Sequence, residues 1–133
     1  QCTNDKINLV WYNCSKTPFT DNSFDMVMTV GLLCVTEGDT MRSIIKEIKR
    51  VSKRYVLILE YPLAINEEDY PKNAKKDIEL LFRYQEIDMF WYRDYARHFP
   101  EYVLLDGGRI GPAKGFDEAY HWWLFEKKEA TIG

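Results

Sequence analysis

Apolar positions along the chain switch between two spacings, and the switches divide it into strand-like and helix-like segments. Residues 24–30, FDMVMTV, form a mostly apolar run, as is typical of a central strand in a parallel sheet. Residues 40–53 then carry apolar side chains every three or four positions, which predicts an amphipathic helix with Asp39 or Thr40 as its N-cap. Residues 54–60, RYVLILE, predict a second buried strand, so this region forms a strand–helix–strand crossover unit.

The rest of the pattern extends this unit into an α/β frame. The further elements predicted are a strand over 7–12, helices over 77–89 and 91–99, and strands over 102–105 and 120–126. The last two strands are joined by the glycine-rich loop 106–115 without a helix, which predicts an antiparallel pair. We expect a single domain over residues 1–133.

Composition and charge narrow the class of protein. Hydrophobic residues make up 46% of the 133 and charged residues 29%, which excludes a disordered tail. The net charge is −3 with both signs mixed, so we expect no nucleic-acid partner. No apolar run approaches the roughly 18 residues of a membrane span and no signal peptide is recognisable, so we expect no membrane partner.

Cysteine and histidine usage adds two expectations. The three cysteines match no zinc spacing, and Cys14 and Cys34 lie in apolar surroundings as free thiols, which favours a reducing, cytoplasmic setting. The two histidines, His98 and His121, are far apart and lack matching carboxylates, so no metal site is expected.

Candidate site residues follow from the rule that ligands bind outside the carboxyl ends of parallel strands. Gly31 and Leu32 follow the first buried strand, and Glu60 and Tyr61 end the second. Glu60 is either a base or substrate contact or a surface carboxylate, and Tyr61 either lines a pocket or does not. Two further candidates lie later in the chain. His121 begins the last strand, and Arg93 either pairs with Asp94 or binds an acidic substrate.

Several short stretches together resemble the second half of a class I S-adenosylmethionine-dependent methyltransferase. Their sequences are most similar to those of the methylases associated with pseudaminic acid biosynthesis. The matching stretches are Pro18-Phe19, Asp21-Asn22-Ser23-Phe24-Asp25, Gly31-Leu32-Leu33, Lys46-Glu47-Ile48-Lys49-Arg50-Val51-Ser52, Glu60-Tyr61, Tyr92-Arg93-Asp94-Tyr95 and His121-Trp122-Trp123-Leu124-Phe125-Glu126.

The resemblance implies a fold, a cofactor and a substrate class. The fold would be α/β, an incomplete Rossmann-like methyltransferase sheet, mostly parallel with a C-terminal antiparallel strand pair. The cofactor would be S-adenosylmethionine, with Asn13 hydrogen-bonding the adenine amino group and the Cys14 backbone beside the ring. Val30, Gly31 and Leu32 would lie under its methionine part. The acceptor would be a small molecule, such as a sugar-pathway intermediate.

The resemblance also assigns roles at the acceptor. Glu60 or His121 would help to remove a proton from it, and Tyr61 and Arg93 would bind it.

Four departures from the family pattern leave a second hypothesis open. The family's glycine-rich cofactor loop and ribose-binding acidic residue are absent and would precede Gln1, so we expect the N-terminal half to be missing. Either an upstream segment or a second chain would then complete the sheet, or residues 7–12 would move in to pair elsewhere. Asn13 stands where the family has an acidic residue, and Val35 stands where the subfamily often has histidine. The alternative is a degenerate methyltransferase-like module without catalysis that serves assembly or partner binding.

Overall fold

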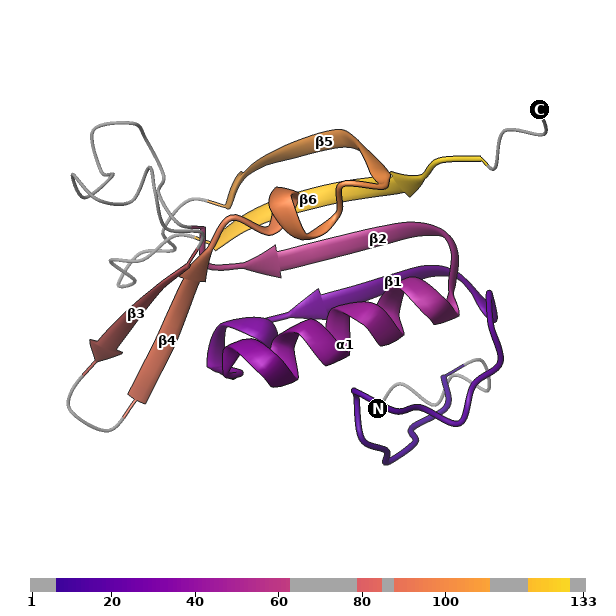
Figure 1. Cartoon of the computed structure of the whole chain (residues 1–133), viewed down its shortest axis with the longest axis horizontal. Coiled ribbons are helices and arrows are strands. Elements are labelled where there is room, and N and C mark those ends of the chain that lie inside the picture. Colours follow the sequence, from indigo (N-terminus) through magenta and orange to yellow (C-terminus); the bar gives the residue numbers. More distant parts are fainter. Residues whose placement is uncertain (1–6, 63–78, 85–87, 111–119, 130–133) are drawn as a thin grey trace.

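A computed structural model describes residues 7–62, 79–84, 88–110 and 120–129 of the chain (Figure 1). Its elements, in order, are β1 (Phe24–Val30), the 3-10 helix η1 (Leu33–Val35), α1 (Gly38–Val51), β2 (Ser52–Glu60), β3 (Glu79–Tyr84), β4 (Asp88–Arg93), the 3-10 helix η3 (Tyr95–His98), β5 (Tyr102–Ile110) and β6 (Tyr120–Lys127).

The main sheet has four strands in the order β1-β2-β6-β5. β1 and β2 are parallel, with Val27 opposite Val56, whereas β6 is antiparallel to both β2 and β5. The α/β class and the C-terminal antiparallel pair are therefore confirmed. The prediction of a mostly parallel sheet is wrong, because only one of the three pairings is parallel. Strands β3 and β4 form a separate two-stranded ribbon, which projects from the end of the sheet where β1 and β2 terminate (Figure 1).

Helix α1 forms where its apolar spacing predicted, and it covers one face of the sheet. The stripe on its inner side is buried, at Met41, Ile44, Ile45, Ile48 and Val51. The N-cap is Glu37, whose side chain makes no capping hydrogen bond, so the prediction of Asp39 or Thr40 as cap is wrong. The helix forms without that cap because burial of the apolar stripe stabilises it more than a capping hydrogen bond would.

An aromatic group after β4 completes the core on the same face. The Phe99 ring stacks on Phe125 of β6 at 4.4 Å, and the Tyr95 ring meets Trp123 edge-on at 5.3 Å. All four side chains are at least 93% buried. The core therefore lies between the sheet on one side and α1 with η3 on the other.

Residues 7–12 contradict the predicted first strand. They form no strand, and Trp11 is fully exposed with Leu9 at 92%. As a consequence β1 is an edge strand of the described sheet, not a central one. Its alternate side chains Met26, Met28 and Val30 are 50–60% exposed. An apolar run becomes a strand only when its backbone pairs with a neighbouring strand, and among the described residues no strand pairs with residues 7–12.

The two helices predicted over 77–89 and 91–99 are wrong across the residues the structure describes there. Residues 79–84 and 88–93 pair as an antiparallel ladder, with Leu81 opposite Trp91. Only residues 95–98 are helical, as one 3-10 turn. The aromatic residues in this stretch favour strands, and pairing satisfies the backbone along its length. The predicted loop 106–115 also begins later, because β5 continues to Ile110; residues 111–115 lie outside the described ranges.

Candidate functional site

The turn after β1 is built on a glycine. Gly31 has a φ of +61°, and its N–H donates to the Leu59 carbonyl of β2 at 3.0 Å. This left-handed conformation is one that residues with a Cβ adopt at a cost, so glycine suits the position. The turn leads directly into η1 at the carboxyl ends of the two parallel strands, which is where such sheets bind ligands.

Glu60 ends β2 beneath this turn, and its side chain is fully buried. One carboxylate oxygen accepts the N–H groups of Leu32 at 3.0 Å and Leu33 at 2.9 Å, and the other accepts that of Cys34 at 3.2 Å. Burial raises the pKa of Glu60, and the three N–H donors oppose this by stabilising the charged form. The structure thus places this predicted base against the backbone of the turn.

Arg93 reaches the same turn from the end of β4. Its buried guanidinium donates to the carbonyl oxygens of Leu33 at 2.6 Å and Thr36 at 2.7 Å, and it lies 4.9 Å from the Trp91 ring. Asp94 bonds Arg97 at 3.3 Å. The residue predicted to bind substrate therefore also binds the turn, and the prediction that it touches a substrate stays a prediction.

His121 lies directly opposite Glu60 in the β2–β6 ladder. Directly opposed residues in an antiparallel pair share a face, so the two predicted proton acceptors come together on the core side. The His121 ring lies 4.4 Å from that of Trp123, and burial lowers its pKa. The imidazole is therefore neutral at pH 7 and able to accept a proton.

Three tyrosines form a group of ring contacts, and one of them, Tyr120, reaches Gly31. The Tyr61 ring stacks on Tyr120 at 4.6 Å and meets Tyr92 edge-on at 5.4 Å. A Cβ placed on Gly31 would stand 3.5 Å from the Tyr120 hydroxyl. Tyr120 was not among the predicted site residues, because it only begins an apolar strand and nothing in its sequence context marks it.

The predicted cofactor residues fall into two groups. Cys14 and Leu32 line one open cavity of about 110 Å³ between α1, β1 and the segment before β1. Asn13 lies outside the lining, and its Oδ1 accepts the Ser15 N–H at 2.9 Å in a local turn. Val30 is exposed at the end of β1, next to Gly31. The cavity is smaller than the roughly 300–1,000 Å³ of ligand pockets, and the assignment of these residues to a cofactor stays a prediction.

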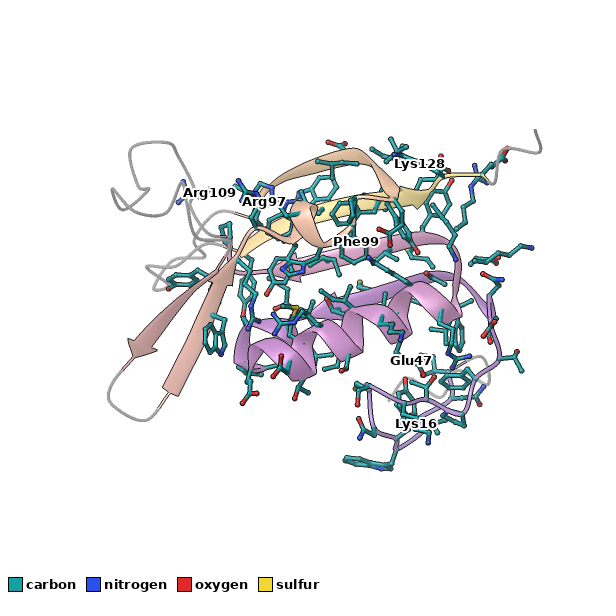
Figure 2. All side chains as sticks on the ribbon, in the orientation of Figure 1. Lys16, Glu47, Arg97, Phe99, Arg109 and Lys128 are labelled. Carbon is teal, nitrogen blue, oxygen red and sulfur yellow. The ribbon has the colours of Figure 1, made fainter. Side chains whose placement is uncertain are left out.

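The segment leading into β1 is anchored by a pair that sequence reasoning missed. Glu47 accepts the Thr17 N–H, and Arg50 donates to Glu47, to the Asp21 carboxylate at 2.9 Å and to the Phe19 carbonyl at 2.7 Å. Hydrogen bonds from Arg50 and Thr17 lower the pKa of Glu47 to about 2. Figure 2 shows Glu47 on the side of α1 that faces the segment carrying Lys16. The spacing of three within a helix hinted at the pair but not at its backbone partners.

Two features are absent from the described residues. Within the described ranges, no group of three or more His, Cys, Asp or Glu side chains is arranged to hold a metal ion. Among the same residues, no helix has the length and apolar character needed to cross a membrane.

The described sheet and its β1–α1–β2 crossover are similar in fold to solved methyltransferase structures. Residues 1–59 match the family model described as "Methyltransferase domain". The resemblance to S-adenosylmethionine-dependent methyltransferases is therefore confirmed, whereas the link to pseudaminic acid stays a prediction. No curated protein matches the chain.

Three solved structures share the fold. The first is the 1,6-didemethyltoxoflavin-N1-methyltransferase of Burkholderia thailandensis with bound 1,6-didemethyltoxoflavin and S-adenosylhomocysteine, at a TM-score of 0.63 and 11% identity, covering 87% of this chain and 48% of that one. The second is a SAM-dependent methyltransferase from Methanosarcina mazei, at 0.60 and 19%, covering 90% and 66%. The third is a protein from Pyrococcus horikoshii, at 0.60 and 16%, covering 92% and 60%. The chain thus spans about half to two thirds of the length of these structures.

Proposed function

We propose that the chain is part of an S-adenosylmethionine-dependent methyltransferase that acts on a small molecule. The observation that carries this proposal is the turn at Gly31, at the carboxyl edge of β1 and β2 in a fold shared with methyltransferases. A glycine at this place leaves the backbone open to a ligand. We place the protein in the cytoplasm, and its acceptor among planar or sugar-pathway small molecules.

The residues present fit one side of the cofactor. Cys14 and Leu32 line the same apolar cavity, and Val30 and Gly31 lie at its strand's carboxyl end. The Asn13 Oδ1 accepts from the Ser15 N–H at 2.9 Å and from the Ser15 hydroxyl at 2.7 Å, so an adenine amino group would have to displace one of these donors. When bound, S-adenosylmethionine supplies an electrophilic methyl group on a positively charged sulfur.

The chain's own residues would orient the acceptor and receive its proton. Tyr61 stands at the end of β2 with one ring face on Tyr120, which suits packing against a planar or sugar ring. His121 is neutral at pH 7 because burial lowers its pKa, so it is our candidate for the proton acceptor. In-line transfer needs the acceptor atom, the methyl carbon and the sulfur aligned, and such positioning supplies much of the acceleration.

The second candidate function is a methyltransferase-like module without catalysis that serves assembly. Asn13 in place of an acidic residue favours it, and so does the exposed apolar side of the edge strand β1 at Met26, Met28 and Val30. The two candidates make opposite predictions for cofactor binding, so one titration separates them.

The test is calorimetric titration of S-adenosylmethionine and S-adenosylhomocysteine into the protein at its natural length. We expect binding by the wild type, loss of binding in Leu32→Arg, which fills the cavity, and retention in Val103→Arg. Val103 is 44% exposed on β5 and carries the same new charge elsewhere. Absence of binding by the folded wild-type protein rejects the enzyme. Self-association of that protein by sedimentation then supports the assembly module.

A further inference from the structure

The loop Gly31–Thr36 is held by two charged side chains of opposite sign from different elements. Glu60 of β2 accepts three of its N–H groups, and Arg93 of β4 donates to two of its carbonyl oxygens. We propose that Glu60 and Arg93 are positioning residues that fix this loop in the shape that binds the cofactor. The proposal rests on the proposed function and gives both residues a role other than base or substrate ligand.

Leu33 is the point where the two side chains act together. Its N–H donates to Glu60 at 2.9 Å and its carbonyl accepts from Arg93 at 2.6 Å, so both polar groups of this fully buried residue are satisfied by charged partners. Hydrogen bonds to ionised partners are shorter and stronger than neutral ones. The loop therefore cannot shift along either side chain without breaking a buried hydrogen bond.

Because both are buried, the loop N–H groups and the Glu60 carboxylate depend on each other. Leu33 and Cys34 are at most 1% exposed, so their N–H groups cannot hydrogen-bond to bulk water and depend on Glu60. Glu60 is equally without water, so its charge depends on those three donors. Both carboxylate oxygens are engaged in this way, which leaves Glu60 committed to the loop.

Backbone contacts fix the two side chains relative to each other. The Arg93 N–H donates to the Tyr61 carbonyl at 3.4 Å, and Pro62 forms a parallel bridge with Arg93. Arg93 is also the last residue of the projecting β3–β4 ribbon (Figure 1). The loop at the cofactor edge therefore takes its shape from the main sheet and the ribbon together, and displacement of the ribbon reaches the loop through Arg93.

Amide hydrogen exchange measured by NMR tests the proposal directly. In Glu60→Gln we expect the amide protons of Leu32, Leu33 and Cys34 to exchange about tenfold faster. The substitution removes the charge and replaces one accepting oxygen by an NH₂ group, which cannot accept from a backbone N–H. In Arg93→Met we expect the same three amides to accelerate. Arg93→Lys should restore part of the protection, because an ammonium reaches one carbonyl where the guanidinium fork reaches two. Ile58 in the β2–β6 ladder reports global opening and should not change.

Matched controls are Glu37→Gln and Arg97→Met. Glu37 makes no side-chain capping bond, and Arg97 is 55% exposed and pairs with Asp94. Both should leave loop exchange unaltered. If Glu60→Gln does not fold, the two Arg93 variants decide alone. Unchanged exchange at Leu32–Cys34 in the folded variants, or equal acceleration at Ile58, overturns the proposal.

Titration of S-adenosylhomocysteine separates this proposal from the function on which it rests. We expect the wild-type protein to bind S-adenosylhomocysteine. The affinity should be about tenfold weaker in Glu60→Gln and Arg93→Met and unchanged in the two controls. A catalytic base would instead leave loop exchange and affinity unchanged in Glu60→Gln. Wild-type protein that binds nothing while the loop responds to both substitutions rejects the proposed function and leaves Glu60 and Arg93 as the residues that shape the loop.

Discussion

Glu60 and His121 lie directly opposite each other at the carboxyl end of β2, on neighbouring antiparallel strands. Sixty residues of intervening chain give no hint of this, yet both were candidates for the same proton-transfer role. The Glu60 carboxylate is committed to three backbone N–H groups, whereas His121 has a ring neighbour in Trp123. The pair therefore divides into a residue that shapes the site and a residue that remains our candidate base.

The lowered pKa of His121 makes stability depend on pH. Because its folded pKa lies below the unfolded value of about 6.5, the unfolded chain binds the proton more readily. The contribution to the free energy of unfolding is full above pH 6.5 and is lost as the pH falls through the folded pKa. Urea unfolding of His121→Asn should lack this loss, while the exposed control Arg42→Met on α1 should keep it. A midpoint for His121 at or above 6.5 in an NMR titration would contradict the prediction.

The left-handed turn at Gly31 predicts a graded response to substitution. Gly31→Ala should lower the free energy of unfolding by about 1–2 kcal/mol, the cost of a Cβ at positive φ. The new Cβ would stand 3.5 Å from the Tyr120 hydroxyl, an ordinary contact, so strain and not collision is the cause. Gly31→Asn should cost less, because asparagine tolerates this conformation better. Denaturant unfolding of the wild type and the two variants measures the order of their stabilities. An alanine variant as stable as wild type would contradict the prediction.

The Glu47 carboxylate should make the protein sensitive to acid. Its pKa of about 2 lies below the unfolded value, so the unfolded chain binds the proton first as the pH falls. The stabilisation by Glu47 is therefore full above about pH 4.5 and is lost toward pH 2. The difference in unfolding free energy between wild type and Glu47→Gln should shrink from pH 6 to pH 3. For comparison, Asp39→Asn changes a carboxylate that is 85% exposed and should show a weaker trend. A constant difference across this range would count against the anchoring role of Glu47.

Cys34 and Cys14 should differ strongly in reactivity. Burial, followed by the nearby Glu60 charge, raises the pKa of Cys34 to about 12. At pH 8 its thiolate population falls on the order of a thousandfold below that of an ordinary thiol. Iodoacetamide followed by peptide mass spectrometry should therefore modify half-buried Cys14 well before Cys34 in the folded protein. Both cysteines should react alike in urea. Rapid labelling of Cys34 in the folded protein would show that the loop Gly31–Thr36 opens readily.

Local pattern was a good guide where one element decides its own structure. β1 was predicted at its observed bounds, α1 and β2 within two residues, and Gly31 and Leu32 at the strand's carboxyl end. The pattern misled for residues 79–84 and 88–93, where a helical spacing of apolar residues gave way to a paired ribbon. The strand signal there comes from a partner strand, and periodicity in one segment contains no information about its partner.

The sequence by itself determined the crossover unit, the apolar stripe of α1 and the resemblance to methyltransferases, because these depend on residues close together in the chain. Only the tertiary structure decided that β1 is an edge strand, that Glu60 faces His121, and that Arg93 meets Glu60 at Leu33. Each of these depends on strand order and on which backbone groups remain buried without a partner. Those quantities arise only when segments distant in the sequence are packed together, so the chemistry of Glu60 and Arg93 could not be read from the residues around them.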